Sequence, residues 1–286
     1  MEYTQFGNTG RKVSRLGFGG AVAGLKNYLE EFDPDDKKSY NNVVEAIGRA
    51  YELGVTFYDT APGYGEHRSE RMYGDGLSGI DPETVFLSTK LGARTYDDVF
   101  RSVEESLKSL KRGYVDLIQI HGGSYTMEHA KSILEDGGIL SAMEDAKRQG
   151  LTRYIGFTTE DNNDAMYLLM KSGRFDSVQM CYNFINQHPY EPSRPFGSLY
   201  EAKKLGMGTI TMRTATSDTF QRWIRMINPG NEFDYTPALI QYVLSNPLVD
   251  VALVGMRTID IVEKNVAIAE DTNGRINLDD VFKRYV

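Results

Sequence analysis

Val251-Ala252-Leu253-Val254 is a run of apolar residues that lacks the alternation of apolar and polar residues found in a half-exposed strand. Such a run is typical of a parallel strand that is buried on both faces. It is followed by a loop and by a segment, 259–269, with the pattern of an amphipathic helix. The order strand, loop, helix is one β-α unit, and the chain before this run repeats it.

The same unit recurs along the chain after an opening hairpin. The hairpin is expected at 3–6 and 12–15, around the turn Gly7-Asn8-Thr9-Gly10. The other expected strands are 16–19, 56–59, 85–90, 115–121, 154–157, 177–180 and 209–212. The other expected helices are 39–53, 69–77, 97–110, 140–149, 162–171, 198–204 and 237–245.

Eight strands alternating with eight helices predict an α/β fold, the (β/α)8 TIM barrel, here with an N-terminal β-hairpin. The 286 residues suit one such barrel, which typically needs about 250, so we expect a single domain over residues 1–286. A doubly wound open sheet is the alternative. Its dinucleotide-binding fingerprint is incomplete, because Gly17-Phe18-Gly19-Gly20-Ala21-Val22 has a valine at the place of the third glycine.

Charge and cysteine content argue against several classes of protein. The net charge of −8 disfavours nucleic acid or an anionic membrane as the main partner, because both bind clustered Lys and Arg. The one cysteine, Cys181, cannot form an intrachain disulfide, and no Cys-x-x-Cys pattern indicates a zinc site. No signal-peptide pattern or bilayer-length apolar run is present. We expect a cytoplasmic protein without a metal, and the sequence leaves its oligomeric state open.

Four polar side chains gather at the ends of three neighbouring strands. Asp59 ends the strand 56–59 and Tyr64 lies in the loop after it, whereas Lys90 and His121 end the next two strands. Each residue alone has an ordinary structural explanation, such as a cap or a core histidine. Because catalytic residues of a (β/α)8 barrel come from the carboxyl ends of its strands, their coincidence predicts a catalytic set.

The chemistry of these groups suits the reduction of a carbonyl compound. Hydride addition leaves an alkoxide, which needs a proton donor and nearby positive charge. Tyr64 can donate the proton, and the ammonium of Lys90 would lower the pKa of its phenol. Asp59 can hold Lys90 in place, and neutral His121 can orient the carbonyl oxygen. None of the four supplies a hydride, so a cofactor must.

Motifs along nearly the whole chain resemble those of the aldo-keto reductase superfamily. They are Leu16-Gly17-Phe18-Gly19-Gly20, Phe57-Tyr58-Asp59-Thr60-Ala61 with Tyr64-Gly65, Ser88-Thr89-Lys90, Asp116-Leu117-Ile118-Gln119-Ile120-His121, Ile155-Gly156-Phe157-Thr158, Gln179 with Tyr182-Asn183, and Val254-Gly255-Met256-Arg257 leading to Asn265. The resemblance implies a TIM barrel with NAD(P)H across its rim. It also implies the catalytic tetrad named above, with His121 indicating reduction of C=O rather than C=C, or the reverse oxidation of an alcohol.

The resemblance also implies a set of cofactor-binding residues. Beside Asp59, two small residues would line the nicotinamide ribose and two polar ones would hold the carboxamide. A further group would contact the pyrophosphate and adenosine. Gly20 and Ala21 are expected beside the ribose, and Thr158 and Gln179 are expected at the carboxamide. Gly255, Arg257 and Asn265 are expected at the pyrophosphate and adenosine. Met212 replaces an aromatic ring often stacked on the nicotinamide, and Arg213 beside it could reach the phosphates.

Departures near the adenosine bear on the choice of cofactor. Ile261 stands where the family often has Gln or Arg, and Lys264 stands where the family often has Glu. Arg257 and Lys264 then remain as candidates to bind a 2′-phosphate, unless they are only solvated helix charges. We favour NADP(H) and do not exclude NAD(H).

Other functions stay open at this stage. A Schiff-base lyase of the aldolase type would also use a strand-end lysine, here Lys90. A cofactor-sensing module could keep the same site with little turnover. The segment from Thr216 to Tyr235 is expected to be either a lid or substrate wall, or a loop packed on the barrel edge. The sequence does not name the small carbonyl or alcohol substrate.

Overall fold

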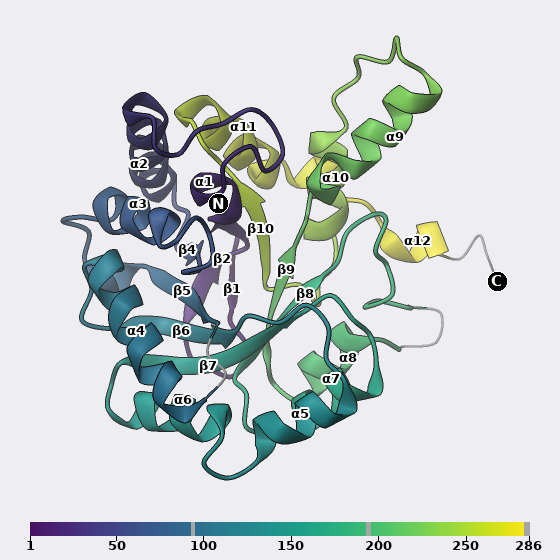
Figure 1. The fold of residues 1–286 in the computed structure, drawn as a ribbon. Helices are drawn as coiled ribbons and strands as arrows, with labels where there is room; N and C mark the ends of the chain where they lie inside the picture. The colour runs from purple at the N-terminus through teal and green to yellow at the C-terminus, as the bar shows by residue number, and fades with distance from the viewer. Residues whose placement is uncertain (93–94, 193–195, 283–286) are drawn as a thin grey trace.

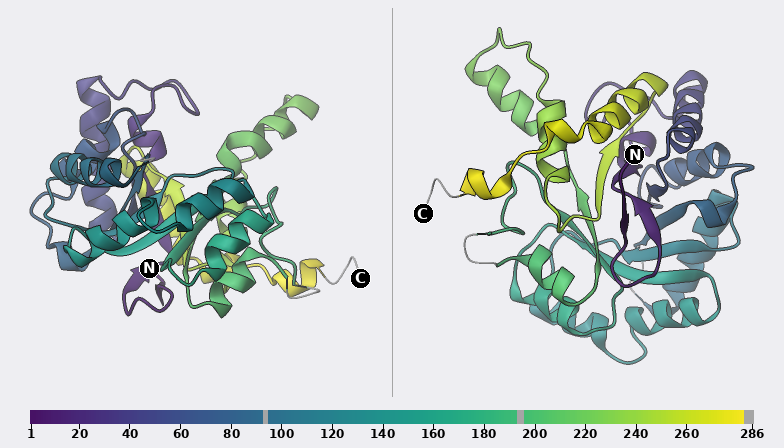
Figure 2. Two further views of the ribbon diagram at one scale, coloured as in Figure 1. Left: turned by 60° about the horizontal axis from the view of Figure 1, so that its bottom comes forward. Right: turned by 180° about the vertical axis from the view of Figure 1, so that it is seen from behind.

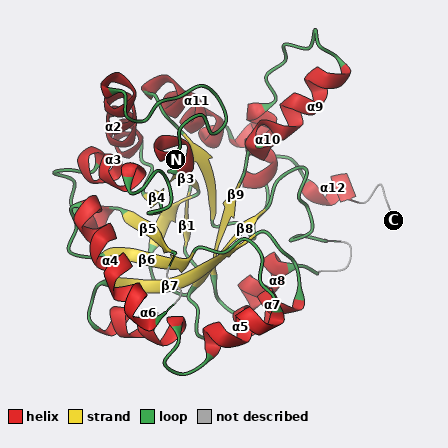
Figure 3. Ribbon diagram, viewed as in Figure 1, coloured by secondary structure: helices red, strands yellow, loops and turns green. Residues whose placement is uncertain are grey.

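The computed structural model describes residues 1–92, 95–192 and 196–282. Its eight parallel strands close into a barrel in the order β10-β3-β4-β5-β6-β7-β8-β9, and β1 pairs with β2 in a separate antiparallel sheet. Figure 1 and Figure 3 show the strands at the centre with helices around them. The predicted TIM barrel with an N-terminal hairpin is therefore confirmed, and the open doubly wound sheet is excluded.

The strands coincide with the expected ones to within a few residues. The hairpin strands are β1 (Tyr3–Gln5) and β2 (Lys12–Ser14). The barrel strands are β3 (Leu16–Gly19), β4 (Phe57–Asp59), β5 (Phe86–Leu91), β6 (Val115–Ile120), β7 (Thr152–Thr159), β8 (Ser177–Cys181), β9 (Gly208–Met212) and β10 (Val251–Gly255).

The expected helices also form, with four additions. The helices are α1 (Ala21–Gly24), α2 (Lys37–Glu52), α3 (Arg68–Gly76), α4 (Tyr96–Leu110), α5 (Met127–Leu134), α6 (Ile139–Arg148), α7 (Asp164–Lys171), α8 (Ser198–Lys204), α9 (Thr219–Ile227), α10 (Thr236–Leu244), α11 (Ile259–Glu270) and α12 (Leu278–Phe282). The sequence does not predict α1, α5, α9 and α12. Of these, α1 and α12 are too short to show a helical repeat.

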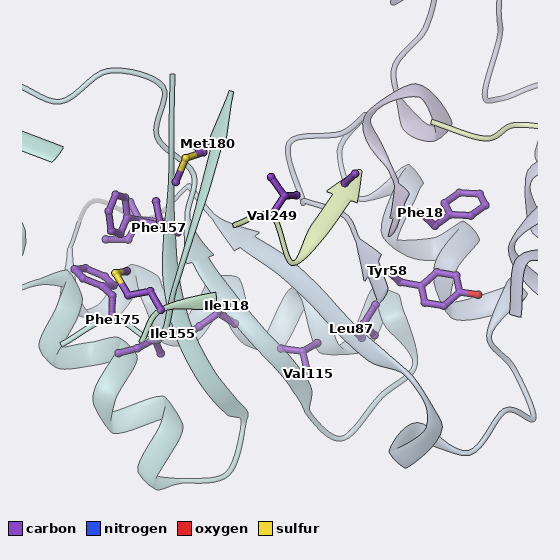
Figure 4. Packing of buried hydrophobic residues seen from close by; sticks show 14 of the residues in the cluster. Phe18, Tyr58, Leu87, Val115, Ile118, Ile155, Phe157, Phe175, Met180 and Val249 are labelled. Atoms are coloured by element: carbon purple, nitrogen blue, oxygen red, sulfur yellow. The ribbon is translucent and has the colours of Figure 1, made fainter. Parts of the chain in front are cut away.

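Side chains alternate along each strand between the barrel interior and its helix-covered outside. Phe57 pairs with Phe86 across β4 and β5, and both belong to a small cluster inside the barrel. Their neighbours Tyr58 and Leu87 belong to the large cluster between the strands and the helices, part of which Figure 4 shows. This period of two follows from strand geometry, and it places alternate residues of one strand in two different hydrophobic clusters.

The N-terminal hairpin closes the barrel where the strands begin. Phe6, which is fully buried, packs against both Phe57 and Phe86, with ring centroids 5.6 and 5.0 Å away. The hairpin can be followed in purple in Figure 2. Because apolar rings fill this end of the interior, ligand-binding side chains belong at the opposite, carboxyl end of the strands.

Most of the segment from Thr216 to Tyr235 projects from the barrel. Its helix α9 has no buried residue and stands away from the barrel in Figure 1. Trp223 and Phe233 are 51% and 67% exposed. Within the described residues, no helix combines the length and apolar character needed to cross a bilayer.

The hairpin plug yields a stability prediction. Replacing Phe6 with alanine leaves a void among aromatic rings, so we expect Phe6→Ala to lower the free energy of unfolding by about 3–5 kcal/mol. Chemical denaturation monitored by circular dichroism measures this. The matched control Phe233→Ala removes an exposed ring and should cost under about 1 kcal/mol. Equal losses in the two variants would contradict the plug.

Candidate active site

Polar residues form the layer of the interior above the aromatic plug. Asp59 follows Phe57 by two residues on β4, and Ser88 follows Phe86 by two on β5. Asp59 pairs with Ser88 in the register of the sheet, and Lys90 pairs with Gln119 on β6. The same period of two that points the rings inward therefore points these polar groups inward at the carboxyl end.

Lys90 and Asp59 form a buried ion pair at the centre of this layer. Lys90 Nζ donates to Asp59 Oδ2 at 2.5 Å and to the backbone oxygen of Thr60 at 2.9 Å. Both side chains are at most 2% exposed. Burial alone would lower the pKa of Lys90, but Asp59 and Tyr64 outweigh it and leave that pKa above its ordinary value. Lys90 is therefore a fixed ammonium ion.

Gln119 links the ion pair to the neighbouring strands. Its Nε2 donates to Gln179 Oε1 at 2.9 Å and to Ser88 Oγ at 3.1 Å, and it lies 3.4 Å from Asp59 Oδ1. No role was expected for Gln119 from the sequence. It lies two residues before His121, so strand alternation alone could have placed it beside the catalytic groups.

Tyr64 and His121 lie on the solvent side of the ion pair. Lys90 Nζ is 4.9 Å from the centroid of the Tyr64 ring, and that ring meets His121 edge to face at 5.6 Å. Burial raises the pKa of the Tyr64 phenol, and the Lys90 ammonium acts in the opposite direction. Burial prevails, contrary to the expected lowering, so Tyr64 holds its proton at neutral pH.

His121 is neutral at neutral pH. Burial among the rim residues, followed by the charge of Lys90, lowers the pKa of its imidazole to about 4. The residue is nevertheless exposed toward the open cavity, where water offsets part of the desolvation. The direction of the shift still leaves a neutral ring that can donate one hydrogen bond.

Close backbone contacts hold the loop that carries Tyr64. A Cβ atom at Gly24 would lie 2.0 Å from the backbone oxygen of Tyr64, and one at Gly65 would lie 2.1 Å from the backbone oxygen of Gly24. Gly65 also has a φ of +73°, which favours glycine. The end of α1 and the Tyr64 loop therefore touch without intervening side chains, and this contact sets the position of the phenol.

One cavity brings together most of the residues expected from the sequence. It is lined by Gly20, Ala21, Asp59, Tyr64, His121, Gln179, Met212, Arg213 and Gly255, together with Gly19, Val22, Leu25, Tyr28, Leu29, Glu160, Thr214, Ala215, Ser217, Leu253 and Val254. Lys90 lies directly behind this surface through its bond to Asp59. Of the segment from Thr216 to Tyr235, only Ser217 reaches the cavity.

Three of the expected cofactor residues lie outside the cavity lining. Thr158 is buried, and its hydroxyl donates to the backbone oxygen of Gly122 at 2.5 Å. Asn265 is buried on α11, and Arg257 is buried two residues beyond Gly255. The sequence predicts the segment from Ala21 to Lys38 as an active-site loop, and its residues Tyr28 and Leu29 line the cavity, although an irregular loop gives no periodic signal that singles them out.

The residues present fit a nicotinamide dinucleotide. Gly20 lines the cavity, and a Cβ there would collide with the buried Ser69 Oγ at 2.6 Å, so this part of the wall requires glycine. At the other end, Arg257 Nη2 is buried and has no hydrogen-bond partner among the described residues, which suits a phosphate oxygen. Gln179 offers an amide to a carboxamide. The described residues contain no cluster of three or more His, Cys, Asp or Glu side chains suited to a metal ion.

Comparison with known proteins agrees with this geometry. The sequence profile of the Aldo/keto reductase family matches residues 15–273, which is most of the chain. The chain belongs to this family.

The similarity to relatives and solved structures of aldo/keto reductases covers nearly the whole chain. L-galactose dehydrogenase of Arabidopsis thaliana is 29% identical, covering 93% of this chain and 88% of the relative. The aldo-keto reductase YhdN of Bacillus subtilis is 26% identical over 98% and 91%. A holo aldo-keto reductase from Bacillus halodurans superposes with a TM-score of 0.77 at 20% identity, covering 98% of this chain and 93% of that one. One from Klebsiella pneumoniae, in complex with NADPH, gives 0.73 at 18%, covering 99% and 94%. Enzymes of this family use NAD(P)H, as expected from the sequence.

The glycine contact beside Tyr64 can be tested by adding a methyl group. We expect Gly24→Ala to force the Tyr64 loop outward and to destabilise the protein by about 1–3 kcal/mol through overpacking. The matched control is Gly113→Ala, because a Cβ at Gly113 meets nothing within 4 Å. The melting temperatures of the two variants, measured by thermal unfolding, should differ by several degrees. If they melt together, the contact does not constrain the loop.

Proposed function

We propose that the protein is an NAD(P)H-dependent reductase of aldehydes or ketones, which also runs in reverse as an alcohol dehydrogenase. The observation that carries the proposal is the convergence of Tyr64 and His121 on one cavity, with the Lys90–Asp59 ion pair behind them. When bound, the nicotinamide supplies the hydride that adds to the carbonyl carbon. The protein must then supply the proton and stabilise the charge on oxygen.

Tyr64 is the proposed proton donor to the carbonyl oxygen. Burial raises the pKa of its phenol, so the proton is present when the substrate binds. As the proton leaves, the ammonium of Lys90, 4.9 Å from the ring centroid, stabilises the tyrosinate. Asp59 keeps Lys90 charged and in place. Neutral His121 donates a hydrogen bond to the same carbonyl oxygen and fixes its direction.

The surroundings of Lys90 weigh against the alternative of a Schiff-base lyase. Attack on a carbonyl carbon requires a neutral, accessible amine. Lys90 is 0% exposed, bonds to Asp59 and to the backbone oxygen of Thr60, and has a raised pKa. Borohydride in the presence of a carbonyl substrate should therefore trap no adduct on Lys90. A cofactor-sensing module is distinguished by measured turnover.

Removal of one oxygen atom tests the proton donor. We expect Tyr64→Phe to lower kcat for carbonyl reduction by at least about a hundredfold, while the dissociation constant for NADPH changes less than about threefold. The physical reason is that the ring keeps its place while the acid is lost. Stopped-flow absorbance and calorimetric titration measure the two quantities.

The matched control for this test is Tyr51→Phe on α2. The hydroxyl of Tyr51 bonds to Thr84 Oγ1, away from the cavity. This variant should reduce carbonyl compounds like the parent protein. Retention of normal turnover by Tyr64→Phe would mean that another group donates the proton.

A second cavity beside His121 indicates a hydroxylated substrate. Besides His121, it is lined by Pro62, Gly63, His67, Gly92, Asp98, Arg101, Ser102 and Glu105. Most of these side chains donate or accept hydrogen bonds, which suits hydroxyl groups better than an alkyl chain. A relative named as a dehydrogenase of a sugar, L-galactose, supports the same substrate class. We propose that the carbonyl compound carries hydroxyl groups that extend into this cavity.

Two aldehydes of equal chain length test the substrate class. We expect kcat/KM for glyceraldehyde to exceed that for propanal by at least about tenfold, because the polar wall pairs with the two hydroxyls. In Arg101→Leu this ratio should fall toward one. Coupled spectrophotometric assays with NADPH measure both constants. A parent protein that prefers propanal would contradict the hydroxylated substrate while leaving the reductase assignment intact.

A further inference from the structure

Arg257 is held by a loop from the other end of the chain. Its Nη1 donates to Glu30 Oε1 at 2.6 Å, and its Nε donates to the backbone oxygen of Val22 at 2.7 Å. The guanidinium carbon also lies 4.1 Å from the centroid of the Phe32 ring. The loop between α1 and α2 therefore binds Arg257 with an ion pair and an aromatic face, and Figure 1 shows this loop passing beside α11.

This contact lies beside the cavity, next to the strand end at which Gly255 lines it. Val22 and Gly255 line the cavity, and Arg257 follows Gly255 by two residues. A dinucleotide held by the residues expected from the family resemblance would have its phosphates and adenosine beside Gly255, Arg257 and Asn265. Arg257 Nη2 remains buried without a partner among the described residues, so the guanidinium can still donate a hydrogen bond to one more anionic oxygen.

The cations near this end are each matched by a carboxylate. Arg257 is 6% exposed and bonds to Glu30, which is 68% exposed. Lys264 on α11 bonds to Asp234 at 2.5 Å. On the far side of the cavity, Arg213 bonds to Glu160 at 2.5 Å. The region expected to bind the adenosine therefore has positive groups but little net positive charge.

We propose that Glu30 is a cofactor-specificity residue that restrains the preference for NADPH over NADH. The inference rests on the proposed function, because it concerns the cofactor of that same site. NADPH differs from NADH by one phosphate group, which carries close to two negative charges at neutral pH. The Glu30 carboxylate neutralises Arg257 and repels this extra phosphate, whereas the diphosphate common to both cofactors is affected equally.

The ratio of two dissociation constants tests the proposal. Calorimetric titration with NADH and with NADPH, at low ionic strength, gives the ratio Kd(NADH)/Kd(NADPH) for the parent protein and for Glu30→Gln. We expect this ratio to rise at least about tenfold in Glu30→Gln, because one repulsive charge near a dianion is removed. Added salt should reduce the gain.

Glu31→Gln is the matched control, because Glu31 is the next acidic residue of the same exposed loop and no contact with Arg257 involves it. Its ratio should equal that of the parent protein. An unchanged ratio in Glu30→Gln, or equal shifts of both constants, would overturn the inference and leave the reductase assignment standing. Failure of the parent protein to bind either cofactor would overturn the proposed function itself.

Discussion

The ion pair between Lys90 and Asp59 is the constraint on which the rest of this structure depends. Two charges with almost no exposure each lose several kcal/mol of hydration, and only good geometry with further hydrogen bonds offsets that loss. The barrel provides this geometry because β4 and β5 are neighbours in the sheet. The backbone oxygen of Thr60 and the amide of Gln119 complete the shell. Removal of one partner would leave the other charge buried and unpaired, so the pair specifies both the register of these strands and the electrostatics of the site.

A second consequence follows from strand alternation. The inward positions of β4, β5 and β6 begin with apolar residues and end with polar ones, so one interior contains an aromatic plug below and a charged layer above. The plug excludes water from beneath the ion pair, which strengthens the field of Lys90 at Tyr64. Stability and chemistry therefore occupy opposite ends of the same strands, as in other TIM barrels.

Loops contribute more to the wall of the cavity than the barrel strands do. The close contact of Gly24 with the Tyr64 loop places the phenol, and the loop between α1 and α2 supplies Tyr28 and Leu29 to the wall and Glu30 to Arg257. In a protein of net charge −8, a site for an anionic cofactor has to be built locally. The proposed site contains two arginines, Arg213 and Arg257, each held by a carboxylate from another segment.

The sequence by itself determined the barrel, because strands and helices of regular period recur in order. It also placed the four catalytic candidates, because three of them end successive strands and Tyr64 lies in the loop after the first of these strands. Periodicity is a local property, so it can be recognised without knowing the fold. The sequence could not show that Thr158 bonds to Gly122, that Gln119 bridges Asp59 and Gln179, or that Glu30 reaches Arg257 across 227 residues of chain. Lys90 acts to lower the pKa of Tyr64, as expected from the sequence, but burial, which depends on every surrounding element, outweighs it and raises that pKa. Only the tertiary structure decided these points, because they depend on distances between segments that are remote along the chain.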